Sequence, residues 1–401
     1  MKKLNRLIVV FSVIIVTFLF VPTLTVNASP ATSYTYTLNS KGRMVRTQDA
    51  YLPERTIIEL NLNDPQDLFF DENDIMYIAD TGNSRIVKYN PNTDEVLYII
   101  ENPDFRQPTG VFVVNDELYI ADKQAQLVFK YTTDGELLEV FDSPEEASFE
   151  GKVFDPAKIA VDKAGNMYIQ AASLVDGIIQ LSDTGEFLGY FTSNLVDMSL
   201  VEKIQDWIFT KEQKEKFFRR EPSIFSNVYI DNEGLVYTTS MNAEGTGIKR
   251  HNIAGGNQFG SVFAPNDPID IYTNDQGVIF VGMAYGSIFV YSRDGDYIFS
   301  FGASNFSDGT SDDISGLFNS ISAIAVDSQG RVWVLDNKKS FIQSFTPTEY
   351  ATKIYDALNL YYEDRDYEAS VEVWKDVLRL NQMSVLAHNY IGKNYYAMQE
   401  Y

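Results

Sequence analysis

The chain of 401 residues contains no cysteine and only two histidines, His251 and His388. The absence of cysteine excludes disulfide bonds, thiol catalysis, thiolate metal sites and the lipidated cysteine of a bacterial lipoprotein. Two histidines are too few for a multi-histidine zinc site of the kind that zinc lyases use. Since His388 lies in a helical pattern, a serine–histidine–acid mechanism would depend on His251 alone. We interpret His251 as a surface or hairpin-end residue near the end of a strand.

Basic residues are also scarce, with 32 Lys and Arg against 56 Asp and Glu, and the formal net charge is -24. Such a surface repels phosphate backbones, so nucleic acid is excluded as a partner. The chain has neither a Gly-Lys-Ser/Thr phosphate loop nor a Gly-x-Gly-x-x-Gly fingerprint. It does have 45% hydrophobic residues, including 27 Phe and 25 Tyr, which suffice for a large core without disulfides.

The N-terminal segment has the pattern of a secretory signal. Lys2, Lys3 and Arg6 precede an uncharged apolar run, which ends at Val26-Asn27-Ala28. We expect residues 1–28 to be a signal peptide of Gram-positive type. The alternative is an uncleaved anchor, because the run approaches the ~20 residues that a membrane-spanning helix needs. Both alternatives predict a secreted or cell-surface protein, with possible membrane attachment through this segment or through sequence after residue 401.

One pattern recurs six times between residues 29 and 346. An apolar strand leads into a tight acidic or glycine turn and a second strand that contains an aromatic residue: Tyr77, Tyr119, Tyr168, Tyr237, Phe280 and Trp333. Repeats of roughly 40 to 50 residues with four strands each are typical of propeller blades. The sequence therefore predicts a mainly β fold, a six-bladed β-propeller.

Closure of the propeller is expected to involve the N-terminal part of the chain. The last repeat supplies only three strands, so we predict that residues 56–60 add its outer strand and leave no open edge. Residues 34–38 form another extended segment, for which the sequence gives no partner.

Residues 78–86 read Ile-Ala-Asp-Thr-Gly-Asn-Ser-Arg-Ile and resemble the signature of the NHL repeat family. Pro108-Thr109-Gly110 followed by residues 119–122 resembles a second, weaker copy. The resemblance covers residues 56–346 and implies a six-bladed propeller. It does not imply an activity, because the family contains both binding modules and enzymes.

Residues 194–221 interrupt the repeats between the third and fourth blades with a pattern typical of helices. The predicted exposed face of this insertion is basic and includes Lys203, Lys211, Lys214 and Lys216. Two interpretations stay open. The insertion is either a solvated lid on a propeller face or a docking surface for an acidic partner or an anionic polymer.

From residue 347 to residue 401 the apolar period changes from 2 to 3.6. The pattern starts again after 34 residues, and Gly392 and Tyr395 occupy places at which a tetratricopeptide repeat (TPR) has glycine and tyrosine. Leu358 and Gln382 depart from that resemblance. Because the second copy stops at Tyr401 after one helix, we expect the sequence to be a fragment of a longer protein.

The preferred functional hypothesis is a non-catalytic extracytoplasmic binding or scaffold protein without a cofactor. Propeller loops that join second to third strands, and fourth to first strands, gather at one face. The polar rim predicted there would bind protein or carbohydrate, although loop solvation explains each residue singly: Asp80, Asn83, Asp122, Gln124, Asn242, Tyr285, Asp336 and Asn337.

The alternative hypothesis is a metal-dependent hydrolase. Some six-bladed propellers resemble gluconolactonases, and this resemblance implies one divalent cation, such as calcium, held by oxygen ligands in the central channel. Candidate ligands lie near the starts of predicted inner strands: Asp67, Asp155 and Asp270, with Asp267 and Asn227 as further oxygen donors. No motif in the sequence links them.

Overall fold

The computed structural model describes residues 34–147, 149–192, 223–241, 243, 247–260, 262, 267–305 and 315–399. The predicted signal segment, residues 1–28, lies outside the described residues. So do the predicted helical insertion, residues 194–221, with its four lysines, and the predicted rim residue Asn242.

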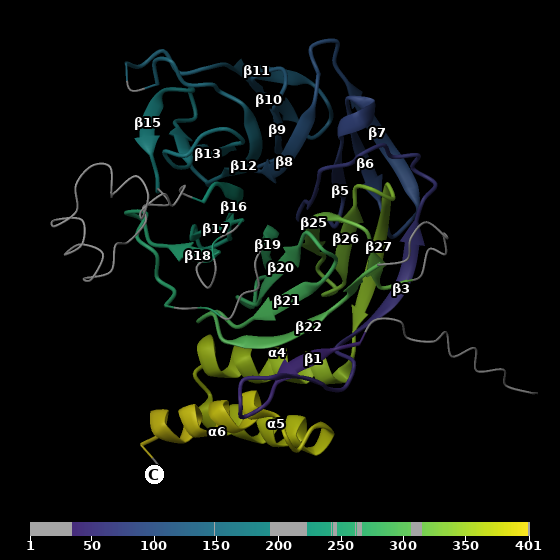
Figure 1. The fold of residues 1–401 in the computed structure, drawn as a ribbon, viewed down its shortest axis with the longest axis vertical. Coiled ribbons are helices and arrows are strands. Elements are labelled where there is room, and N and C mark those ends of the chain that lie inside the picture. Colours follow the sequence, from purple (N-terminus) through teal and green to yellow (C-terminus); the bar gives the residue numbers. More distant parts are fainter. Residues whose placement is uncertain are drawn as a thin grey trace, which may run out of the picture. The chain divides into compact units, whose positions relative to one another are not determined.

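Six antiparallel blades follow one another along the chain (Figure 1) and confirm the predicted six-bladed, mainly β fold. The first blade contains β4 (Asp67–Phe70), β5 (Met76–Asp80), β6 (Arg85–Asn90) and β7 (Glu95–Glu101). The second contains β8 (Pro108–Val114), β9 (Glu117–Asp122), β10 (Leu127–Thr132) and β11 (Leu137–Phe141). The third contains β12 (Pro156–Val161), β13 (Met167–Ala171), β14 (Ile179–Leu181) and β15 (Phe187–Tyr190).

The fourth blade has three strands among its described residues: β16 (Phe225–Ile230), β17 (Val236–Ser240) and β18 (Ile248–His251). The fifth contains β19 (Pro268–Thr273), β20 (Ile279–Met283), β21 (Ile288–Tyr291) and β22 (Tyr297–Phe301). The sixth contains β25 (Ile321–Val326), β26 (Val332–Asp336) and β27 (Phe341–Pro347). A short parallel pair, β23 (Ala303–Ser304) and β24 (Leu317–Phe318), lies between these last two blades in the sequence.

The ring closes through the N-terminal part of the chain, as the sequence predicts. Strand β3 (Tyr51–Ile57) pairs antiparallel with β27 and completes the sixth blade, and the inner strand β25 contacts β4. The predicted bounds, residues 56–60, were wrong by several residues. Leu60 and Leu62 are instead buried in the connection between β3 and β4, where they join the core shared by the first and sixth blades.

The extended segment without a predicted partner extends the fifth blade. Strand β1 (Tyr36–Leu38) pairs antiparallel with β22, and β2 (Met44–Arg46) pairs with β1. The fifth blade therefore contains six strands, in the order β19-β20-β21-β22-β1-β2.

The recurring turns owe their shape to one side chain each. In the turn before β5, Asp71 Oδ1 accepts backbone N–H bonds from Asn73 and Ile75 at 2.9 and 3.0 Å. Asp231 and Asp327 make the same pair of bonds in the fourth and sixth blades. Their second oxygens accept from the recurring aromatics, as in Trp333 Nε1 to Asp327 Oδ2 at 2.8 Å. Each of these repeats thus contains an aspartate that shapes the turn and a buried aromatic residue that donates a hydrogen bond to this aspartate.

Three helices follow the last blade: α4 (Glu349–Tyr362), α5 (Tyr367–Leu380) and α6 (Val385–Ala397). Asp366 and Ser384 cap α5 and α6 by accepting N–H bonds from Ala369 and Ala387. Within the described residues, no helix is both long and apolar enough to span a membrane.

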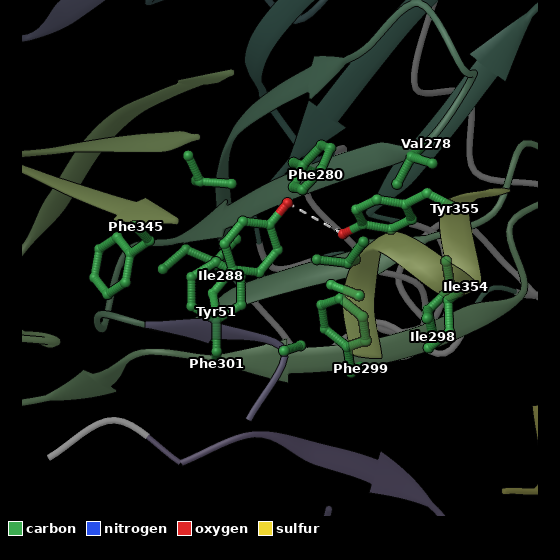
Figure 2. Close-up of a cluster of buried hydrophobic side chains, with 14 of the residues drawn as sticks. Tyr51, Val278, Phe280, Ile288, Ile298, Phe299, Phe301, Phe345, Ile354 and Tyr355 are labelled. Atoms are coloured by element: carbon green, nitrogen blue, oxygen red, sulfur yellow. Dashed lines mark hydrogen bonds between the residues drawn. The ribbon is translucent and has the colours of Figure 1, made fainter. Parts of the chain in front are cut away.

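Helix α4 shares one core with the fifth and sixth blades. Figure 2 shows Tyr355 of α4 among Phe280, Phe299 and Tyr51, and its hydroxyl donates to the Tyr51 hydroxyl at 3.3 Å. These side chains are almost fully buried. Because burying an aromatic side chain contributes roughly 1.5–3 kcal/mol, the helices are an integral part of the propeller core.

The helices contact the fifth blade along its outer strand and at one of its turns (Figure 1). Tyr362 and Tyr390 donate hydroxyl bonds at 2.8 and 3.0 Å to Asp294 and Asp296, in the turn between β21 and β22. We call the propeller face with this turn the turn face, because turns between first and second strands and between third and fourth strands emerge there. The opposite face, with the remaining loops, is the loop face. The predicted ligand rim belongs to the loop face.

Candidate functional site

The centre of the propeller contains a cluster of buried charged and polar side chains near the starts of the inner strands. Asp67, Lys158, Asn227 and Asp270 occupy equivalent register positions in four blades. Lys158 Nζ donates to Asp67 Oδ1 at 2.6 Å and to the Gln66 carbonyl at 2.9 Å. Asn227 Nδ2 donates to Asp270 Oδ1. The structure therefore brings together two of the three predicted metal ligands, around a lysine ammonium group.

The remaining carboxylate oxygens join neighbouring blades. Asp67 Oδ2 accepts the Val111 N–H at 2.9 Å, and Asp270 Oδ2 accepts the Ile324 N–H at 2.6 Å. Further bonds of this kind surround the channel, such as Ser322 Oγ to the Pro65 carbonyl at 2.9 Å. Because buried polar groups are costly unless paired, this network ties the blades to one another.

Burial raises the pKa values of the two carboxyl groups in this cluster. Desolvation raises the pKa of Asp67, while the ammonium of Lys158 and the Val111 amide oppose that rise. Burial also raises the pKa of Asp270 to about 7, with Lys158 lowering it and Asp67 raising it. The ammonium thus supplies the positive charge in a channel that carries two carboxyl groups.

These residues do not fit the oxygen cage of a divalent cation. A calcium ion needs six to eight oxygen ligands, yet both carboxylates already accept backbone amides and a lysine ammonium lies between the blades. The third predicted ligand, Asp155, is outside the cluster and accepts the Ser173 N–H at 3.2 Å. No group of three or more His, Cys, Asp or Glu side chains suited to a metal occurs in the part of the chain that the structure describes.

The space at the channel centre is small. The cavity measures ≈ 20 Å³ and is lined by Asp67, Asn227, Asp270 and apolar residues of the inner strands. This volume is about that of one water molecule. At the equivalent place in the second blade, a Cβ on Gly110 would approach the Ala157 carbonyl to 2.8 Å, so the inner strands are in close contact there.

Three carboxylates of the predicted rim lie inside the loops. Asp80, Asp122 and Asp336 are fully buried. Asp122 shows the arrangement, because it accepts the N–H groups of Arg106 and Gln107 at 2.8 and 2.9 Å. Asp80 accepts the Asn63 N–H and the Arg85 guanidinium, and Asp336 accepts four backbone N–H groups. Each carboxylate joins a blade to the loop that enters it, and a ligand on the loop face would not reach it.

Four other predicted rim residues reach the surface of the loop face. Asn83, Gln124 and Tyr285 are exposed, and Asn337 is partly exposed. Asn83 also donates to Asp80 and to the Asn61 carbonyl. Since these residues come from the first, second, fifth and sixth blades, they are spread around the face.

The two histidines have different surroundings. His388 is exposed on α6. His251 ends β18 at a hairpin, but it is buried, so a surface position was wrong for it. Its Nδ1 lies 3.0 Å from the Gly255 carbonyl and its Nε2 lies 2.8 Å from Thr238 Oγ1. A carbonyl only accepts, so Nδ1 carries the proton and the Thr238 hydroxyl donates to Nε2.

This environment predicts a measurable pH dependence. Burial lowers the pKa of His251 from 6.5 to about 4. The unfolded chain therefore binds more protons between pH 6.5 and 4, so the stabilising contribution is present above pH 6.5 and is lost as the pH falls toward 4. Relative to His251→Gln, the wild-type protein should lose about 2 kcal/mol of unfolding free energy between pH 7 and pH 5. Urea unfolding of both proteins at each pH measures this, and parallel losses would contradict it.

Sequence reasoning missed two features. It assigned no role to Lys158, although a lysine stands where the first and fifth blades have aspartate. It also read the outer strand β7 only as part of a blade, although residues 95–101 form an unusually apolar stretch, Glu-Val-Leu-Tyr-Ile-Ile-Glu. Four apolar side chains of this strand are exposed: Val96, Leu97, Tyr98 and Ile99.

The match to a protein family agrees with a propeller. A family described as "Two component regulator propeller" matches residues 315–338, at the start of the sixth blade. Among solved structures, a streptogramin B lyase is 14% identical, with a TM-score of 0.44 over 78% of this chain and 86% of the lyase chain. A catalytically inactive virginiamycin B lyase from Staphylococcus aureus, with quinupristin, is 10% identical, with a TM-score of 0.48 over 80% of this chain and 97% of the other. No curated protein matches. Similarity at this level carries no inference about activity.

Proposed function

We propose that this chain is a non-catalytic binding or scaffold protein that acts outside the cytoplasm. One observation carries the proposal. The charged groups of the central channel are bound to one another and to backbone amides, with Lys158 Nζ 2.6 Å from Asp67 Oδ1. They are engaged in holding the blades together, so they are poorly suited to a metal ion or to acid–base work on a substrate.

The hydrolase alternative is disfavoured by the same arrangement. A lactonase-like mechanism needs an open metal position and room for a substrate, whereas the channel cavity is ≈ 20 Å³. His251, the remaining candidate base, donates to one neighbour and accepts from another inside the fourth blade.

Binding is assigned to the surfaces of the propeller and its helices. The loop face offers the amides of Asn83 and Gln124 and the ring of Tyr285, groups suited to a carbohydrate or a peptide. We interpret the three C-terminal helices as TPR-like. The NHL resemblance and the signal pattern of residues 1–28 support a secreted or surface-attached protein of Gram-positive type.

The loop-face part of the proposal can be tested with a glycan array and a set of extended peptides applied to the full chain. Tyr285→Ala and Gln124→Ala should weaken binding by about tenfold. Glu72→Ala, an exposed residue of the turn face, is the matched control and should change nothing.

Isothermal titration with calcium, manganese and zinc should show no saturable binding. Saturable binding that Asp270→Asn abolishes would favour the hydrolase instead.

A further inference from the structure

The outer strand of the first blade is exposed and apolar. The side chains of Val96, Leu97, Tyr98 and Ile99 in β7 are between 37% and 47% exposed. In the sheet order β4-β5-β6-β7, the outer side of β7 pairs with no other described strand. Soluble proteins usually protect such an edge, because its free N–H and C=O groups accept another strand.

The fifth blade shows the same strand position when it is covered. Its outer strand β22 has the register of β7, with a bulge at the corresponding place in both blades. The residues of β22 that correspond to Val96 through Ile100 are Tyr297 through Phe301, and none is more than 9% exposed. They are covered by β1 and by Tyr355 of α4. The outer strand β22 is therefore covered by other segments of this chain, whereas the equivalent strand β7 is exposed.

Strand β1 demonstrates how an added strand attaches. It runs antiparallel to β22 with Tyr36 opposite Ser300, the residue equivalent to Ile99. Thr37 Oγ1 donates to the Ile298 carbonyl at 2.9 Å, and the Tyr297 hydroxyl donates to the Tyr36 carbonyl at 3.0 Å. The bulge in β22 does not prevent this addition, so the equivalent bulge in β7 is no obstacle.

The second blade serves as an internal comparison. Its outer strand β11 has Glu139 at the position of Tyr98, so a charge interrupts its apolar residues Leu137, Leu138 and Val140. A charge in the middle of an edge strand is a common protection against strand addition. The turn before β11 adjoins β7: Tyr98 packs on Gly135 in this turn, where φ is +90° and a Cβ would lie 2.3 Å from the ring. Tyr98 is thereby held in place beside a protected edge.

Charge decides what kind of segment fits β7. Glu95 and Glu101 end the strand and are exposed, and neither forms an ion pair with a described residue. A second copy of β7 paired antiparallel about Tyr98 would place Glu95 opposite Glu101 twice, and like charges directly opposite are destabilising. A segment with an apolar centre and Lys or Arg at both ends would instead complement the strand.

We propose that β7 binds an extended apolar segment with basic ends, contributed by a partner protein, as a fifth strand of the first blade. The partner strand runs antiparallel to β7, as β1 does to β22, and it spans about seven residues or ~24 Å. The inference rests on the proposed binding function and assigns it a class of partner and a location.

The test selects peptides of about nine residues from a random displayed library on the immobilised full chain. The selected peptides are then labelled, and their affinity is measured by fluorescence anisotropy. We expect the selected peptides to have Lys or Arg at both ends and mainly apolar residues between them. Leu97→Lys should weaken their binding by at least about tenfold. The matched control is Leu138→Lys, at the equivalent position of β11, which is also exposed, and it should leave binding unchanged.

Three outcomes of the peptide experiment would overturn the inference: no enriched peptide, peptides without basic ends, or equal binding by wild type and Leu97→Lys. Sedimentation showing a dimer that Leu97→Lys dissociates would identify a second copy as the occupant and would also overturn it. Circular dichroism confirms that both variants are folded. Failure here leaves the loop-face experiment with Tyr285→Ala unaffected, so failure of this inference and failure of the proposed function are distinguishable.

Discussion

Deletion of residues 29–57 is expected to unfold the whole propeller rather than to trim one edge. The deletion removes β3, which pairs with β27 at six positions from Ile57 opposite Ile342 to Tyr51 opposite Pro347. It also removes Tyr51, whose ring stacks on Phe301 with 4.6 Å between centroids. The loss opens the ring and exposes a core shared by two blades and α4. The cost should therefore approach the total stability of a domain, about 5–15 kcal/mol.

Differential scanning calorimetry of the deleted chain should show no cooperative transition above 25 °C. The control is a chain shortened only by residues 1–28, which should keep the full transition. A second deletion, of residues 29–46, removes β1 and β2 but keeps β3. It should lower the melting temperature and leave the transition cooperative. A chain without β3 that melted at the wild-type temperature would refute closure by this strand.

The second large effect is expected for Lys158→Met. Removal of the ammonium leaves Asp67 buried without its positive partner, and breaking a buried ion pair from one side costs about 3–5 kcal/mol. Lys130→Met is the matched control, because Lys130 pairs at 2.9 Å with Glu117, which is partly exposed. Its loss should cost less than about 1 kcal/mol. Urea unfolding at pH 7 measures both.

Two further measurements separate electrostatics from packing. The double variant Lys158→Met with Asp67→Asn removes both charges and keeps an acceptor for the Val111 N–H, so it should be more stable than Lys158→Met alone. The deficit of the single variant should also shrink as the pH falls. Burial already raises the pKa of Asp67, and without Lys158 the protonated carboxyl is favoured further in the folded state. A deficit independent of pH would indicate a packing effect only.

The local sequence pattern predicted the blades well, because each blade depends on contacts between residues close in the sequence. Asp71, Asp231 and Asp327 each bond to amides two and four residues ahead, and such turns are visible in the sequence alone. The closing strand was found but misplaced. Its position depends on the burial of Leu60 and Leu62 against another blade, which local pattern does not report.

The candidate site was less predictable, because its partners lie far apart in the sequence. Lys158 and Asp67 are 91 residues apart, and only the ring geometry brings them to 2.6 Å. Likewise, the sequence does not show whether an acidic loop residue such as Asp122 faces solvent or accepts hydrogen bonds from the backbone of a neighbouring loop. The structure shows the second arrangement, because N–H groups of the incoming loop surround the carboxylate.

The pairing of β3 with β27 in the sixth blade has a mechanical consequence. Tyr51 and Pro347 lie opposite one another at the same end of the β3–β27 ladder. A pulling force applied to the residues before β3 and after β27 would break the hydrogen bonds of this ladder one after another, starting at Tyr51 and Pro347. It would not stretch all of them at the same time. The Thr348 hydroxyl and Asn381 amide, which bond to Asp49 and Thr47, bridge the two segments ahead of the ladder. Tension must break these bonds, and the pairing of β1 with β22, before it reaches the β3–β27 ladder.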